Sequence, residues 1–124
     1  MMVAKSQGGA GRNLFLKRSR DIEYAKQHGH RFSTALFNVV ICRTGMNGSR
    51  VGIVVGRRFG GAVSRNRVKR LFRELTRQLR GQLLPGYALV VFPKRDSIAQ
   101  PFANLKEMWV SALQRQRLLR MYED

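Results

Sequence analysis

A cluster of positively charged residues between positions 57 and 80 has the chemistry needed to bind phosphate groups. This segment holds nine cations and a single acid, Glu74. The cations are Arg57, Arg58, Arg65, Arg67, Lys69, Arg70, Arg73, Arg77 and Arg80. Arginine presents a planar fork that binds a phosphate through two hydrogen bonds, whereas lysine acts as a point charge. The segment therefore predicts contact with a polyanion.

The spacing of apolar residues predicts a helix over residues 62–79 that would orient these cations. Its apolar stripe follows the helical repeat and consists of Val68, Leu71, Phe72, Leu75 and Leu79. On a helical wheel most of the cations fall on one lateral face beside this stripe, whereas Arg67 lies apart near Glu74. Only Arg70 is suitably spaced for an i,i+4 pair with Glu74, so ion pairs cannot neutralise the face. We expect one flank of the helix to pack on a sheet and the lateral face to present cations.

The whole chain shares this charge imbalance. Its 124 residues include 24 Lys and Arg but only 7 Asp and Glu, which gives a formal net charge of +17. Charge runs on helices are usually solvated faces, but a face of nearly one sign is costly unless a polyanion neutralises it. Codon usage in a GC-rich genome could explain the excess of arginine over lysine, but not the net charge. Nucleic acid is therefore the expected partner, and Asn66 could either hydrogen-bond a base edge or 2′-hydroxyl or cap the helix.

The side chains that could catalyse hydrolysis are scattered along the sequence. An independent nuclease needs a cluster of carboxylates or histidines for metal or acid–base work. The acids are Asp21, Glu23, Glu74, Asp96, Glu107, Glu123 and Asp124, without ligand-like spacing. His28 and His30 could bind a metal, although such a pair at a helix end is more often structural or solvated. Catalysis by protein side chains alone is therefore not expected.

Three features predict a cytoplasmic protein with no membrane partner. Cys42 is the single cysteine, so it cannot form an internal disulfide, and its apolar surroundings predict a buried side chain. No apolar run approaches the length that a bilayer requires. The N-terminal residues have no continuous apolar region of the kind found in a secretory signal.

The rest of the chain predicts a single α+β domain over residues 14–120, with a flexible basic arm at 1–13 and a tail at 121–124. A short helix is expected at 19–26, capped by Ser19 or Asp21 and closed by Gly29. Apolar runs predict strands at 34–43, 50–57 and 87–92, and a Gly/Asn turn would join the first two as a hairpin. A last helix begins near Pro101 and could continue to residue 120. The element order is α-β-β-α-β-α, with one face of the sheet partly open.

Residues 56–70 resemble the signature of the bacterial ribonuclease P protein subunit. The shared features are the basic pair Arg57 and Arg58, a glycine, Ala-Val at 62–63, and Arg-Asn-Arg at 65–67 followed by Lys-Arg. The likeness extends to residues 16–29 and 86–93 and covers roughly residues 16–113. The resemblance implies a three- to four-stranded sheet with a left-handed β-α-β crossover, similar to domains of ribosomal proteins and translation factors.

The resemblance also implies a function. A member of this family joins a large catalytic RNA, which supplies the active site and bound Mg²⁺, and together they remove the 5′ leader of precursor tRNA. The implied partners are this RNA subunit and precursor tRNA, without an obligate protein partner. The matching positions imply an RNA-binding set, to which Arg77 is added from its place on the same face. The set is Arg57, Arg58, Arg65, Asn66, Arg67, Lys69, Arg70, Arg73 and Arg77.

The chain departs from the family pattern at several positions. Relatives usually have Ser-Lys-Lys before the glycine and Asn before Ala-Val, where this chain has Gly56-Arg57-Arg58 and Gly61. In the family, the leader lies in a cleft between the first helix and the open sheet face, where aromatic residues can stack on bases. The aligned positions here are Ile22, Lys26 and Val40, and the aromatic residues nearby are Tyr24, Phe32 and Phe37.

Two other functional classes stay open on the sequence. A ribosomal or rRNA-assembly protein would share the basic helix and the fold, but it would not need the Arg-Asn-Arg spacing. A DNA-binding regulator would need a second helix joined through a short turn. The strand-like segments on both sides of the helix at 62–79 argue against the regulator.

Overall fold

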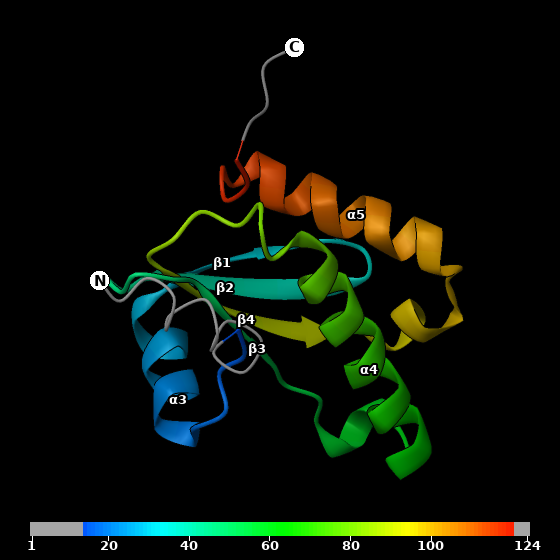
Figure 1. Cartoon of the computed structure of the whole chain (residues 1–124). Helices are drawn as coiled ribbons and strands as arrows, with labels where there is room; N and C mark the ends of the chain where they lie inside the picture. Colours follow the sequence, from blue (N-terminus) through cyan, green and yellow to red (C-terminus); the bar gives the residue numbers. More distant parts are fainter. Residues whose placement is uncertain (1–13, 121–124) are drawn as a thin grey trace.

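The computed structural model describes residues 14–120, which form three α-helices, four strands and two short 3-10 turns (Figure 1). In chain order the elements are α3 (Ser19–His28), β1 (His30–Ser33), β2 (Phe37–Arg43), β3 (Arg50–Ile53), η1 (Arg57–Phe59), α4 (Ala62–Leu79), β4 (Tyr87–Pro93), η2 (Arg95–Ala99) and α5 (Phe102–Arg115). The α+β class is confirmed. The predicted arm at 1–13 and tail at 121–124 lie outside the described residues.

The four strands form one mixed sheet in the order β1-β2-β4-β3. β4 pairs antiparallel with β2 and parallel with β3, so the predicted hairpin between β2 and β3 is wrong. Strand length explains the difference. All seven residues of β2 find partners in the seven residues of β4, whereas β3 has only four residues to offer. Backbone groups at the centre of a sheet need partners on both sides, and the apolar β4 takes this place.

Helix α4 provides the crossover between the parallel strands β3 and β4, which is the connection that the resemblance implies. Its bounds, Ala62–Leu79, agree with the sequence prediction, and Gly61 occupies the N-cap position. Asn66 therefore lies inside the helix, and its interpretation as a cap is wrong. For α3 the N-cap is Arg18 without a side-chain cap hydrogen bond, so the predicted capping by Ser19 or Asp21 is also wrong.

Other elements also differ from the sequence prediction, since α3 extends to His28 and β2 begins at Phe37. β1 was not predicted, because its sequence His-Arg-Phe-Ser has no apolar alternation and pairs only along one edge of β2. β3 ends at Ile53, and residues 57–59 form a 3-10 turn instead of extending the strand. α5 ends at Arg115, two residues before Arg117 turns the chain with a φ of 60°.

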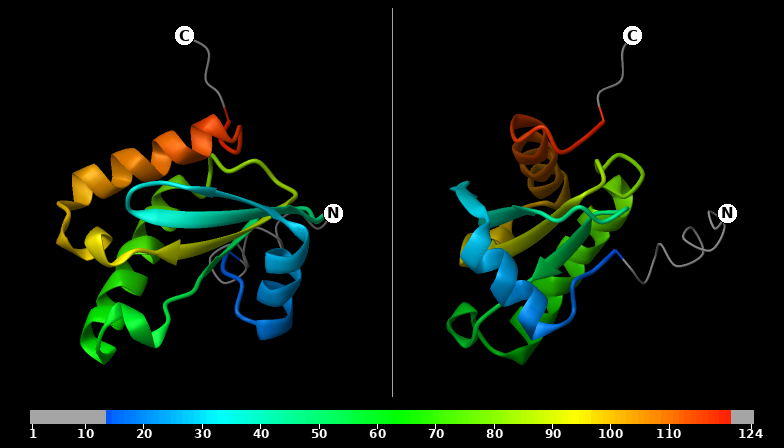
Figure 2. Two further views of the ribbon diagram at one scale, coloured as in Figure 1. Left: turned by 180° about the vertical axis from the view of Figure 1, so that it is seen from behind. Right: turned by 90° about the vertical axis from the view of Figure 1, so that its left-hand side faces the viewer.

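The helices cover the two faces of the sheet unequally (Figure 2). α4 and α5 pack on one face, where Phe37, Phe72 and Trp109 meet edge to face with ring centroids 5.4–5.8 Å apart. α3 alone packs on the other face, where its buried Ala25 joins a smaller cluster with Val40, Cys42, Ala88 and Val90. The predicted burial of Cys42 is confirmed.

Between residues 14 and 120, no helix is both long and apolar enough to span a bilayer.

Candidate nucleic-acid interface

Helix α4 is fixed against the sheet by its apolar stripe. Val68, Phe72, Leu75 and Leu79 are buried, while Leu71, the fifth predicted member, is half-buried. Thr76 is also buried, and its hydroxyl donates a hydrogen bond of 2.8 Å to the carbonyl of Phe72. The buried hydroxyl is thereby satisfied within the helix. Since this flank is held in the core, the helix positions that carry the cations keep a fixed direction relative to the sheet.

The predicted site residues around α4 are mostly exposed. We call them together the α4 basic surface. The exposed members are Arg57, Arg58, Asn66, Arg67, Arg70, Arg73 and Arg77, and the half-buried members are Arg65 and Lys69. Most of the cationic head groups of this surface are therefore open to a large ligand.

Ion pairs neutralise little of this surface. Within residues 14–120 there are two salt bridges, and only one of them involves α4. It joins Arg77 Nη1 to Glu74 Oε1 at 3.9 Å, three residues apart, whereas the sequence offered Arg70 as the partner of Glu74. Both side chains are about half exposed, and a pair of this kind contributes roughly 0–1 kcal/mol. The surface remains strongly positive.

Arg65 is held differently from the other members. Its Nη1 donates a 2.6 Å hydrogen bond to the carbonyl of Gly60, in the loop before α4. Arg95, in η2, donates a 2.7 Å hydrogen bond from Nη1 to the neighbouring carbonyl of Phe59. Gly60 has a φ of 154°, which favours glycine. Two guanidinium groups thus donate hydrogen bonds to consecutive carbonyls and stabilise the loop that carries Arg57 and Arg58.

Arg95 was not found by sequence reasoning, because it begins η2, 30 residues after Arg65 and outside the basic segment at 57–80. Its role depends on η2 lying beside α4 in space. No local pattern in the sequence shows this contact.

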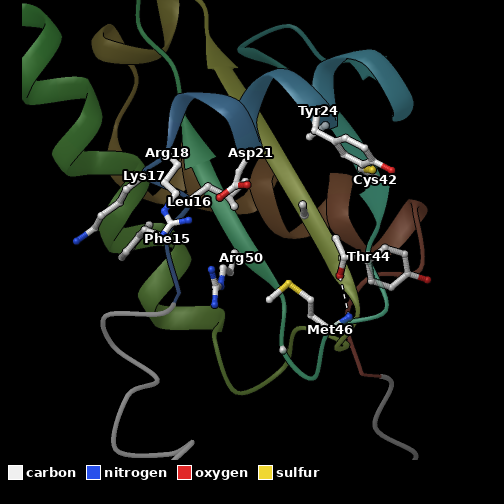
Figure 3. A pocket seen from close by; sticks show the side chains of 14 residues that line it. Phe15, Leu16, Lys17, Arg18, Asp21, Tyr24, Cys42, Thr44, Met46 and Arg50 are labelled. Atoms are coloured by element: carbon white, nitrogen blue, oxygen red, sulfur yellow. Dashed lines mark hydrogen bonds between the residues drawn. The ribbon is translucent and has the colours of Figure 1, made fainter.

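A second group of cations lies on the face of the sheet that α3 covers (Figure 3). A cavity of about 460 Å³ lies beside α3, and Cys42 of β2 and Ala88 of β4 are among its lining residues. Lys17, Arg18 and Arg50 contribute positive charge to its lining, and Asp21 is the single acid there. Tyr24 also lines the cavity, is 57% exposed and stacks on the ring of His28 at a centroid distance of 4.0 Å.

Phe92 lies on the sheet face that α3 covers, at the opposite end of β4 from Ala88. Lys26 Nζ lies 5.9 Å from the centroid of its ring and the Arg31 guanidinium carbon lies 6.0 Å from it. Asn38 is the cross-strand partner of Phe92, and its buried Oδ1 has no hydrogen-bond partner in the structure. These side chains bring a flat ring, an amide and two cations together, which we call the Phe92 platform.

The two phenylalanines that are close in sequence to the aligned cleft positions belong to the larger core cluster. Phe37 is fully buried between α4 and α5, and Phe32 packs against the same core. Strand alternation gives the signal that could have found Phe92, since Ala88, Val90 and Phe92 share the face that meets α3. The pairing of β4 with both β2 and β3 was needed to use it.

Within residues 14–120, no group of three or more His, Cys, Asp or Glu side chains could hold a metal ion. His28 and His30 point to different partners. His28 Nδ1 lies 3.0 Å from the carbonyl of Tyr24, and His30 Nε2 lies 3.3 Å from Oε1 of Gln116. His28 and His30 therefore do not converge on one site.

Comparison with known proteins gives one consistent result. The family model described as Ribonuclease P matches residues 11–117. A protein named ribonuclease P protein component from Thermotoga petrophila is 34% identical over 94 residues, 76% of this chain and 79% of the relative. A protein of the same name from Chloroflexus aggregans is 32% identical over 105 residues, 84% of this chain and 78% of the relative. The solved structure of the RNase P protein from Thermotoga maritima matches with a TM-score of 0.74 and 32% identity, covering 82% of this chain and 96% of that chain.

Proposed function

The chain belongs to the ribonuclease P protein family, whose members are protein components of a ribonuclease, and we propose that its α4 basic surface binds the RNA subunit of that enzyme. The observation that carries the proposal is a set of seven exposed residues, six of them arginines, on and just before a helix anchored by its opposite flank. Arginine forks suit the phosphate oxygens of a folded RNA. Asn66 adds an exposed amide that can hydrogen-bond a base edge or a 2′-hydroxyl.

We further propose that the face under α3 holds the single-stranded 5′ leader of precursor tRNA. The Phe92 platform supports this role. A base can stack on an exposed part of an aromatic ring, and each such contact is worth roughly 1–3 kcal/mol in other proteins. Lys26 and Arg31 beside the ring can neutralise the phosphates that connect stacked bases. The platform supplies an aromatic surface although Ile22, Lys26 and Val40 are not aromatic.

In this proposal the protein positions RNA and does not cleave it. The Mg²⁺ ions that would activate water belong to the RNA subunit and the substrate phosphates, as the family resemblance implies. This chain contributes cations that reduce repulsion between two polyanions, and a surface that fixes the leader relative to the cleavage point. The reaction takes place where tRNA precursors are made, which in bacteria is the cytoplasm.

Reconstitution tests the proposed function. The purified chain is added to a bacterial ribonuclease P RNA with precursor tRNA at a Mg²⁺ concentration too low for the RNA alone. We expect the chain to promote removal of the 5′ leader. Absence of stimulation across the salt range in which the chain is folded would refute the proposal. Equal binding to an unrelated structured RNA of similar length would favour the alternative, a general ribosomal or rRNA-assembly protein.

A further inference from the structure

A hollow with three arginines lies at the C-terminal end of α4, away from the start of the helix that carries the Arg-Asn-Arg motif. The cavity has a volume of about 510 Å³. Arg50, Arg80 and Arg120 line it, and none of its lining residues is an Asp or a Glu. Arg80 directly follows α4, while Arg50 begins β3 and Arg120 lies after α5. Segments far apart in the sequence therefore bring three arginines to the lining of one hollow.

Backbone pairing places Arg120 there. After α5, the turn at Arg117 reverses the chain, and Leu119 pairs with Leu83 in an antiparallel bridge. The amide of Arg120 donates a 2.7 Å hydrogen bond to the carbonyl of Gln82, and the carbonyl of Leu118 accepts one of 2.8 Å from Leu84. Figure 1 shows this red segment returning to the loop that follows α4. Arg120 is thus held near Arg80 by the main chain and not by a flexible connection.

The loop on the other side of the hollow is also fixed. Ser49 accepts a 3.0 Å hydrogen bond from the amide of Tyr87 and donates one to the carbonyl of Leu84. The next residue, Arg50, is half-buried and lines both this hollow and the cavity beside α3 (Figure 3). Arg50 therefore stands between the α3 face and the hollow.

The charge of the hollow is not balanced within the described chain. Between residues 14 and 120, the two salt bridges involve Lys26 and Arg77, and none involves Arg50, Arg80 or Arg120. Like charges that surround one hollow repel each other, and the repulsion is relieved when an anion binds. Guanidinium groups fit phosphate oxygens in particular, because their paired N–H groups match two oxygens.

We propose that Arg50, Arg80 and Arg120 form a second phosphate-binding site, which takes a phosphodiester group of RNA. The proposal rests on the proposed function and extends it, since the site lies outside the predicted RNA-binding set. Two strands of RNA could supply the phosphate: the RNA subunit, or a leader that continues from the α3 face past Arg50. Both carry the same ligand chemistry, and the substrate used in the test distinguishes them.

The test compares the double variant Arg80→Gln/Arg120→Gln with the matched control Arg43→Gln/Arg115→Gln. All four arginines are exposed, and both variants remove the same charge. Binding to the ribonuclease P RNA subunit, to precursor tRNA with short and long leaders, and to mature tRNA is measured between about 50 and 200 mM salt. We expect the double variant to bind RNA on the order of tenfold more weakly per arginine at low salt. The slope of log affinity against log salt should fall by roughly one per arginine.

The pattern of losses identifies the source of the phosphate. A loss with the RNA subunit alone assigns the phosphate to that subunit, and a loss confined to long leaders assigns it to the leader. If the double variant and the control lose affinity equally, the second site is refuted while the proposed function stands, provided that the wild-type chain stimulates cleavage. Unchanged RNA affinity with a lower melting temperature would show that the arginines pair with carboxylates of the chain itself, and would also overturn the proposal.

Discussion

Removal of two charges from the middle of α4 should change the salt dependence of RNA binding by a predictable amount. Arg70 and Arg73 are exposed, and neither forms an ion pair within residues 14–120. If each contacts one phosphate, the double variant Arg70→Gln/Arg73→Gln lowers the slope of log affinity against log salt by about 1.4–1.8. A fourfold change in salt then changes the ratio of wild-type to variant affinity by roughly sevenfold to twelvefold.

The assay is a filter-binding titration of labelled ribonuclease P RNA at about 50 and 200 mM salt. The expected result is a large defect at low salt that shrinks as salt rises. The control Arg43→Gln/Arg115→Gln removes the same charge from the end of β2 and from α5, and we expect its defect to be smaller. The thermal melting curve should not shift downward for either variant, because the four arginines make no described contact with a carboxylate.

Parallel salt-dependence lines for the wild-type chain and the Arg70→Gln/Arg73→Gln variant would refute the reasoning. That result would mean that neither arginine displaces counterions from the RNA. An equal change of slope in the control would show that bulk charge, and not the orientation of α4, determines recognition. Both results can be read directly from the slopes, without any assumption about the absolute affinity.

Three further outcomes follow from particular contacts. Arg65→Ala should lower the free energy of unfolding, measured by urea denaturation, by about 1 kcal/mol, because it removes the hydrogen bond to the loop before α4. The control Arg67→Ala should change the free energy of unfolding by less than about 0.5 kcal/mol. Phe92→Leu should weaken binding of precursor tRNA by roughly 1 kcal/mol or more, measured by fluorescence titration, without changing the affinity for mature tRNA. An equal loss of affinity for both RNAs would contradict the proposal that the Phe92 platform binds the leader. Gly29→Ala should destabilise the fold by about 1–3 kcal/mol and lower the melting temperature, because its Cβ would lie 2.6 Å from a backbone oxygen. The control Gly56→Ala places its Cβ in open space and should leave the melting temperature nearly unchanged.

The sequence predicted the parts of the fold that local patterns determine. α4 has a strong apolar stripe, Gly61 before it and Gly81 after it, and its bounds were predicted correctly. β4 is an almost continuous apolar run, which correctly predicted an interior strand. Both features depend on residues that are close together in the sequence, so that no knowledge of the topology was required.

The parts that failed depend on competition between distant segments. The Gly and Asn residues at 45–48 permit a tight hairpin, and the hairpin does not form because β4 offers β2 a longer partner. β1 is polar, and only its pairing with β2 makes it a strand. The Phe92 platform could not be found for the same reason, since it requires the register of β2 against β4 together with the packing of α3. Local propensity contains none of this information.

The structure also divides the tasks of the Arg-Asn-Arg motif. All three motif side chains were predicted to contact RNA, but Arg65 uses one of its N–H donors for a hydrogen bond to the carbonyl of Gly60. Arg95 donates a hydrogen bond to the neighbouring carbonyl of Phe59. An arginine has five N–H donors, so this bond leaves others for a ligand. The anchored loop holds Arg57 and Arg58 next to the start of α4, and a flexible loop would have to lose conformational entropy before they could bind together. In the proposed function, part of the motif therefore acts before RNA arrives, by fixing the loop from which Arg57 and Arg58 would contact the RNA.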